Sequence, residues 1–229
     1  TITGTSYGGA AVCMGGSWVD KLTISGGTLN HDESTEYGIS LYAGLITLSA
    51  DVAFDINYNQ LQTTTSSTGF IKIDSGVTIT KDHKIGFNSN GSNGIYYLYS
   101  STSEATRNSM YDHVTLVDTY NLMKPNATQG KYTKDSTYYG MLYLGNVLNV
   151  TQQKVYTLLA DAVSAATAGD EIDIIVSHDA GAVTISKNLT IYSSTGATYT
   201  GDITTSATTL NLGTSNYPFN LNGRLATST

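Results

Sequence analysis

Four acidic residues in the second half of the chain are the clearest candidates for chemistry. They are Asp170, Glu171, Asp173 and Asp179. Two carboxylates that face one sugar ring can cleave a glycosidic bond. On a strand, Glu171 and Asp173 share a face because side chains alternate, whereas Asp170 falls in the preceding turn. The pattern would fit polysaccharide cleavage if that face lines a substrate groove, and a solvated surface if it does not.

The segment Gly4-Thr5-Ser6-Tyr7-Gly8 matches the G-x-S-x-G motif of serine hydrolases. That motif activates its serine only on a strained turn between a strand and a helix. Too few residues precede the segment to form the strand, and no helical pattern follows it. We therefore expect Ser6 to have no catalytic role. No other motif places a nucleophile, a base and an oxyanion donor together.

Histidine and cysteine are the usual zinc ligands, but their spacing here does not fit a zinc site. The histidines are His31, His83, His113 and His178, and the single cysteine is Cys13. No two histidines are four residues apart, and none has a zinc-like spacing with the cysteine. We interpret His31 and His178, each followed by Asp, as turn residues. We expect no metal and no cofactor, since no phosphate-binding loop is present either.

Two tyrosine-rich segments suggest a binding surface. The residues concerned are Tyr96, Tyr97, Tyr99, Tyr138, Tyr139 and Tyr143. A row of rings on a flat sheet can stack on sugar rings or pack at a subunit interface. The simplest alternative is that the rings face the core. The sequence leaves core, interface and carbohydrate platform open.

Three further positions could carry covalent links. An odd cysteine in an extracellular protein suggests a bond between chains, although Cys13 in its apolar surroundings also fits a buried core residue. Asn90 and Asn126 each begin an N-x-S/T sequon and would be modified in a glycosylating host.

Composition restricts the class of protein. Only 13% of the 229 residues are charged, against about 25% in ordinary domains, and 59 are Ser or Thr. The formal charge of −7 argues against nucleic-acid binding, which needs clustered basic residues. No window approaches the roughly 20 apolar residues of a membrane span. The first residue is Thr rather than Met, consistent with a removed export signal, so we expect an extracellular or cell-surface protein.

A recurring aliphatic-Thr-aliphatic pattern predicts an all-β fold. It occurs at residues 22–24, 46–48, 77–79, 114–116 and 183–185. Three copies extend as apolar pairs on both sides of a polar bend, at 46–56, 77–87 and 183–193. Period-2 patterning across a bend is typical of strand–turn–strand. Because the spacing is uneven, the pattern predicts an irregular parallel β-solenoid, or β-helix, with a β-sandwich as the alternative.

Residues 153–168 break the β pattern with apolar residues at helical spacing. We expect one short capping helix there, with Thr151 as its N-cap and Gly169 just beyond its C-terminus. The chain then divides into a β-rich solenoid-like region, 1–150, and a helix-capped short β-helical region, 151–229.

The run TLLADAVSAATAGDEIDIIV, with GAVTISKNLTI after it, resembles the opening coil of right-handed parallel β-helices of the pectin-lyase-like kind. The resemblance covers about residues 157–192 and implies a fold but no function. It predicts that 171–176, 182–186 and 189–192 are consecutive parallel strands of one stack. It also implies that the acidic residues lie on a solvated coil edge, so we expect Glu171 and Asp173 to be catalytically irrelevant.

These features predict a non-enzymatic structural protein whose partners are copies of itself. It would be a subunit of a self-assembling extracellular polymer, such as a sheath, surface layer or filament, joined through strand edges and solenoid ends. Residues 1–12 are interpreted as an extended arm without a partner of its own, able to add a strand to a neighbour. The alternative is a cell-surface adhesin or carbohydrate-binding module that binds polysaccharide through the tyrosine rows. A polysaccharide-active enzyme on a truncated β-helix is the third hypothesis.

Overall fold

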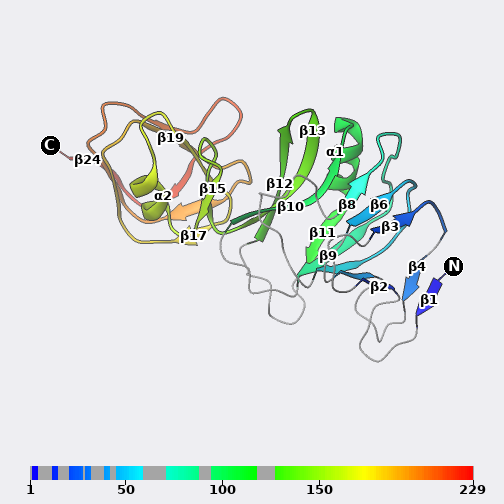
Figure 1. Cartoon of the computed structure of the whole chain (residues 1–229). Coiled ribbons are helices and arrows are strands. Elements are labelled where there is room, and N and C mark those ends of the chain that lie inside the picture. Colours follow the sequence, from blue (N-terminus) through cyan, green and yellow to red (C-terminus); the bar gives the residue numbers. More distant parts are fainter. Residues whose placement is uncertain are drawn as a thin grey trace. The chain divides into compact units, whose positions relative to one another are not determined.

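The protein is an all-β chain built as a β-solenoid, as predicted, rather than as a β-sandwich (Figure 1). The computed structural model describes residues 2–4, 12–14, 21–27, 29–31, 39–41, 45–58, 71–87, 94–117 and 127–228. Within these ranges only two short helices interrupt the strands. No helix among the described residues has the length and apolar character needed to cross a bilayer.

The chain forms two compact units. Unit 1 comprises Thr1–Gly91, Tyr96–Pro125 and Gln129–Leu142; unit 2 comprises Ser92–Ile95, Asn126–Thr128 and Tyr143–Thr229. The predicted boundary near residue 150 remains a prediction about domains.

Unit 1 stacks its strands in two main sheets. The first sheet has the order β11 (Val114–Val117), β9 (His83–Phe87), β7 (Ile56–Tyr58), β5 (Ile39–Leu41) and β2 (Val12–Met14). The second has the order β12 (Ala127–Lys134), β13 (Thr137–Leu144), β10 (Gly94–Ser101), β8 (Ile71–Ile73), β6 (Leu45–Leu48) and β3 (Lys21–Ile24). From β5 to β11, successive strands along the chain alternate between these sheets, which is how coils form.

A short two-stranded sheet corrects the prediction of a free N-terminal arm. Strand β1 (Ile2–Gly4) pairs in parallel with β4 (Leu29–His31). Residues 2–4 therefore already have a partner within the chain. The rest of the predicted arm lies outside the described residues, apart from Val12 at the start of β2.

The aliphatic-Thr-aliphatic copies at 22–24 and 46–48 stack on one another, and β8 continues the stack. Leu22 of β3 pairs with Ile46 of β6, which pairs with Ile71 of β8. Ile46 and Ile71 are fully buried because inward-facing residues of one coil rest on those of the next. The copy at 77–79 is the exception, since it forms no strand, although Ile79 is also buried.

Helix α1 (Glu104–Asp112) was not predicted from the sequence. It begins at Ser103, whose hydroxyl accepts a hydrogen bond from the Thr106 amide (3.2 Å). Its inward face carries a buried arginine, Arg107, whose guanidinium donates to the carbonyls of Tyr132 and Tyr139 (3.1 and 3.2 Å). With a polar residue on the inward face, the segment lacks the apolar stripe by which a helix is recognised.

Unit 2 is a three-faced stack of three coils. The first coil contains β16 (Glu171–Ile174), β17 (His178–Asp179) and β18 (Val183–Ile185). The second contains β19 (Leu189–Tyr192), β20 (Thr198–Thr200) and β21 (Ile203–Thr205), and the third β22 (Leu210–Leu212), β23 (Asn220–Asn222) and β24 (Leu225–Thr227). All pairings between these coils are parallel. The predicted strands at 171–176, 182–186 and 189–192 thus belong to one stack, with no hairpin between the first two. They are not consecutive as predicted, because β17 lies between the first two.

Helix α2 (Leu159–Ala165) caps this stack but is shorter than the predicted helix at 153–168. Residues 154–156 instead form β15 (Lys154–Tyr156), which pairs antiparallel with β14 (Val147–Asn149). Gln153 has a positive φ (54°), which is incompatible with a helix, and Leu158 is the N-cap. Thr151 does not cap the helix, because its hydroxyl accepts from the amide of Glu171. Gly169 has the expected positive φ (96°) but lies four residues beyond the last helical residue.

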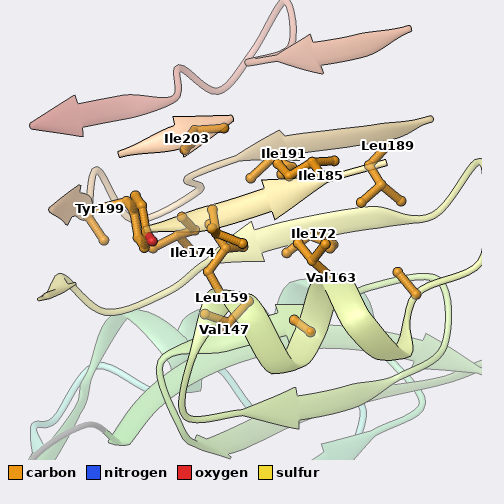
Figure 2. Close-up of a cluster of buried hydrophobic side chains, with 14 residues drawn as sticks. Val147, Leu159, Val163, Ile172, Ile174, Ile185, Leu189, Ile191, Tyr199 and Ile203 are labelled. Carbon is orange, nitrogen blue, oxygen red and sulfur yellow. The ribbon is translucent and has the colours of Figure 1, made fainter. Parts of the chain in front are cut away.

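The apolar face of α2 closes the core of unit 2. Leu159 and Val163 point from the helix towards Ile172 and Ile174 on β16, as Figure 2 shows. The other end of α2 is fixed by Lys187, whose ammonium donates to the carbonyls of Val163, Ser164 and Ala166 (2.7–3.1 Å). A cation at this end also favours the helix dipole.

A stack of glycines forms one corner of unit 2. Gly181, Gly201 and Gly223 occupy the same corner in successive coils. A Cβ on Gly201 would collide with the carbonyl oxygen of Gly181, and one on Gly223 with that of Gly201. The corner therefore admits only glycine at the second and third levels.

We predict that Gly201→Ala destabilises unit 2 far more than Gly196→Ala. Both glycines have a positive φ, 149° and 78°, but nothing lies within 4 Å of a Cβ at Gly196. The control should lose about 1–2 kcal/mol of unfolding free energy through backbone strain alone. Gly201→Ala should lose roughly 1–3 kcal/mol more from the collision. Equal losses in urea denaturation would show that the close approach is unimportant.

Candidate functional site: the open rung of unit 2

The third coil of unit 2 exposes three strand edges at once. Strands β22, β23 and β24 are each the outermost strand of their sheet. Among the described residues each has a hydrogen-bonded neighbour on one side only. An outer strand presents unpaired N–H and C=O groups that can template another strand. We call residues 210–227 the open rung.

The open rung also carries the last members of the inward-facing ladders. Ile172, Ile191 and Leu212 form one ladder, and Val183, Ile203 and Leu225 form another. Leu210 follows Leu189, and Leu221 follows Tyr199. The members in the first and second coils are buried, whereas Leu210, Leu212 and Leu221 are partly exposed and Leu225 is 49% exposed. Each of these leucines is covered on one side by a residue of the second coil and is accessible to solvent on the other.

Almost no charge protects this edge. Between Ile203 and Ser228 the one charged residue is Arg224, and its guanidinium donates to the Asp202 carboxylate (3.1 Å). Both partners are solvent-exposed or half-exposed, so the pair contributes little stability. Proteins usually block open strand edges with charges, especially Lys. The open rung has no lysine.

Asp170 is buried rather than solvated, which corrects the sequence prediction. Its Oδ2 accepts hydrogen bonds from the side chains of Asn149 (2.9 Å) and Gln152 (2.6 Å) and from the amide of Thr167 (2.8 Å). The bond from Asn149 and those from Thr167 and Gln152 lower the pKa of this carboxyl. Asp170 therefore ties the turn after α2 to β14 and is saturated with structural partners.

Asp173 is also buried, against expectation, while Glu171 and Asp179 are exposed as predicted. The amide and hydroxyl of Ser194 donate to its two carboxylate oxygens (2.9 and 2.5 Å). Burial raises the pKa of Asp173, and these bonds oppose the rise. The prediction failed because Ser194, twenty-one residues further along the chain, binds this carboxylate, and a local sequence pattern does not show such a partner. Asp173 and Glu171 do not form an exposed carboxylate pair.

The tyrosine rows are mainly core. Tyr96, Tyr97, Tyr99, Tyr139 and Tyr143 are each at most 7% exposed, and Tyr138 is partly exposed. The Tyr97 and Tyr139 rings stack at 4.4 Å. Burial raises the pKa of Tyr99 well above its usual value. The buried rings cannot offer a face to a sugar in this conformation.

The strongest aromatic feature near the open rung is a different pair. Tyr217, 43% exposed, stacks on the buried Tyr192 at 5.6 Å. Burial, with the Asp173 carboxylate nearby, raises the pKa of Tyr192 to about 12. This pair covers the outer surface of β19.

The histidines and the cysteine lie in different elements of the described chain. His31 and His178 lie in strands β4 and β17, not in turns as predicted, because both strands extend the coil. His113 contacts Asp82 (2.9 Å) and His83 is buried in the core of unit 1. No group of three potential ligands occurs in the described part of the chain. Cys13 lies in β2, its side chain outside what is described; Ser6, Asn90 and Asn126 lie outside the described residues altogether.

The ladder leucines of the open rung were missed by sequence analysis. The signal that could have found them is the regular coil length of unit 2. Paired residues are separated by 19 positions from Glu171 to Thr190 and by 22 from Ile203 to Leu225. One coil length after Val183 the chain reaches Ile203, and one further coil length leads to Leu225.

No family model, curated protein or solved structure that was compared with this chain matches it. The coiled fold therefore stands on the structure itself, and the likeness to pectin-lyase-like proteins stands on the sequence pattern of residues 157–192.

We predict that Asp170→Ala destabilises unit 2 by roughly 1–3 kcal/mol at pH 7, because it leaves the fully buried Asn149 amide without its acceptor. Asp179→Ala removes an exposed carboxylate and should change the unfolding free energy by less than about 0.5 kcal/mol. Since folding lowers the pKa of Asp170, its stabilisation should be present above pH 3.8 and disappear as the pH falls further. A pH-independent difference between wild type and Asp170→Ala down to pH 2 would contradict this role.

Proposed function

We propose that this protein is a non-enzymatic structural subunit of an extracellular polymer, a sheath, surface layer or filament, in which copies join through solenoid ends. The observation that carries the proposal is the open rung, where inward-facing leucines and three strand edges lie exposed together. A solenoid end of this kind needs a cap or a neighbour. Low overall charge supports an assembling surface rather than a repelling one.

The free energies involved show which interactions are needed to join two copies. Fully burying a leucine contributes about 1.5–3 kcal/mol, so the half-exposed Leu225 and the three less exposed leucines would together gain at most about 4 kcal/mol. Association costs at least that much in lost freedom of motion. Apolar contact alone therefore cannot hold two copies together. Backbone hydrogen bonds along β22, β23 and β24, at roughly 0.5–1.5 kcal/mol each, must supply the surplus.

The matching surface on a second copy is the first rung of unit 1. Strands β2 and β3 are the outermost strands of the two main sheets there. Among the described residues, the free edges of β2 and β3 are those that a preceding coil would pair with, and the free edges of the open rung are those that a following coil would pair with. Joining the two continues a parallel stack. Such a head-to-tail contact gives rings or open filaments.

The carbohydrate-binding alternative has less support. It needed exposed tyrosine rows, and five of those six rings are buried. Tyr217 stacks on the buried Tyr192, so this pair exposes one ring rather than a row of rings.

We predict that Leu225→Lys reduces polymer formation by the full chain. The ammonium group would have to be buried at the joint, opposite the ladder position that Ile203 occupies one coil earlier. Leu158→Lys is the matched control, because Leu158 is also an exposed leucine (36%) but lies at the start of α2. Sedimentation velocity over a concentration series, with electron microscopy, measures the effect.

Wild type and Leu158→Lys should polymerise alike, and Leu225→Lys should shift the onset to a higher concentration by tenfold or more. A wild-type chain that stays monomeric at millimolar concentration would contradict the proposal of a structural subunit and favour the adhesin hypothesis. Equal polymerisation of all three proteins would place the joint elsewhere.

We also predict no polysaccharide turnover. In a screen of acidic and neutral polysaccharides, neither wild type nor Glu171→Gln should release products, because Asp173 is buried and bound to Ser194 while Glu171 is exposed alone. Turnover that disappears in Glu171→Gln would overturn the non-enzymatic assignment.

A further inference from the structure

A histidine occupies a core position that is aliphatic in the other copies of the same motif. The segments 46–56, 77–87 and 183–193 align without gaps, and one inward-facing position holds Val52, His83 and Leu189. All three side chains are buried, at 2%, 0% and 3% exposure. In unit 1 a titratable ring thus stands where the solenoid elsewhere places an aliphatic side chain.

The contacts of His83 define its proton state. Its Nδ1 lies 3.1 Å from the Phe54 carbonyl oxygen, and the two rings are 4.6 Å apart. A carbonyl oxygen only accepts, so Nδ1 carries the hydrogen and Nε2 is the bare nitrogen. Nε2 is buried and has no hydrogen-bond partner among the described residues. A proton added there would meet no acceptor.

Several charged groups face this ring. Asp51 and Asp55 lie on the preceding coil, and His113 lies at the end of α1. Asp82 and Lys84 are the neighbours of His83 in the sequence, one before β9 and one within it. The two preceding carboxylates are engaged elsewhere: Asp51 accepts from the amide and hydroxyl of Thr80, and Asp55 from the amide of Lys84. They favour the charged ring from a distance, and His113 opposes it.

Burial outweighs these attractions. Removal from water lowers the pKa of His83, while the Phe54 carbonyl, Asp51 and Asp55 raise it by less. The folded chain therefore holds a neutral ring at a pH where the unfolded chain, with an ordinary histidine pKa of about 6.5, takes up a proton. Below about pH 6.5 the unfolded state binds more protons than the folded state, so stability falls as the pH falls.

We propose that His83 is a pH-sensitive switch whose protonation loosens the packing of unit 1. Protonation of its ring breaks the packing of β9 against Phe54 and loosens the coils on either side. The feature is independent of any assembly, because it acts within one chain. His83 also contacts the start of β11: its amide donates to the carbonyl of His113, the residue before that strand (2.8 Å), and Val114 is its partner in the strand pairing.

Thermal unfolding of the full chain between pH 7.5 and pH 5 tests the proposal. His83→Leu installs the residue that the matching copy has at Leu189, and His113→Gln removes the half-exposed histidine nearby as a control. The wild-type midpoint should drop as the pH falls, by about 2–4 °C for a loss of about 1 kcal/mol. His83→Leu should abolish most of the drop, and His113→Gln should keep it. Hydrogen exchange should rise first at the amides of β9 and β11.

A measurement on the wild-type chain covers the case in which His83→Leu fails to fold. Nitrogen NMR of the imidazole should show a neutral ring with the hydrogen on Nδ1, titrating below pH 6.5. A ring that titrates at or above 6.5 would overturn the proposal. An acid-induced drop unchanged in His83→Leu, or lost in His113→Gln, would do the same.

Discussion

Stacking of like side chains on successive parallel coils is the interaction on which this structure depends. Each inward-facing residue rests on its counterpart one coil away, as Ile172 does on Ile191 and Val183 on Ile203. Removing this apolar surface from water provides the stability, and the parallel register decides which residues meet. Every level of the stack needs a level on each side. The two ends of unit 2 differ in whether such a covering level is present.

At one end of unit 2 the requirement is met inside the chain. Helix α2 covers the first coil, with Lys187 fixing its last carbonyls and Asp170 holding the turn beyond it. At the other end, the open rung repeats the ladder without a covering layer among the described residues. Polar side chains thus make hydrogen bonds at the turns between strands, and Gly181, Gly201 and Gly223 let one corner of each coil pack closely on the next. Two of the four acidic residues that suggested an active site, Asp170 and Asp173, are buried and bind neighbouring polar groups of this framework.

Local periodicity made part of the fold predictable from the sequence. The aliphatic-Thr-aliphatic pattern identified strands that stack in register, and the apolar stripe identified α2. Features set by distant partners could not be predicted in this way. Helix α1 turns a buried arginine inwards, and its stability comes from two carbonyls on other strands. The burial of Asp173 depends on Ser194, twenty-one residues away on the next coil. The burial of His83 likewise depends on a distant partner, because its ring packs against Phe54 of the preceding coil.

Imaging of concentrated native material by electron cryomicroscopy would test the central claim directly. If copies join as further coils of one stack, the filaments should show strands running across the filament axis, with a continuous spacing of about 4.8 Å through each joint. At the joint, Leu225 should lie inside the stack against the first rung of the next copy. Copies joined through the outer faces of their sheets, with β22, β23 and β24 left exposed to solvent, would contradict the account.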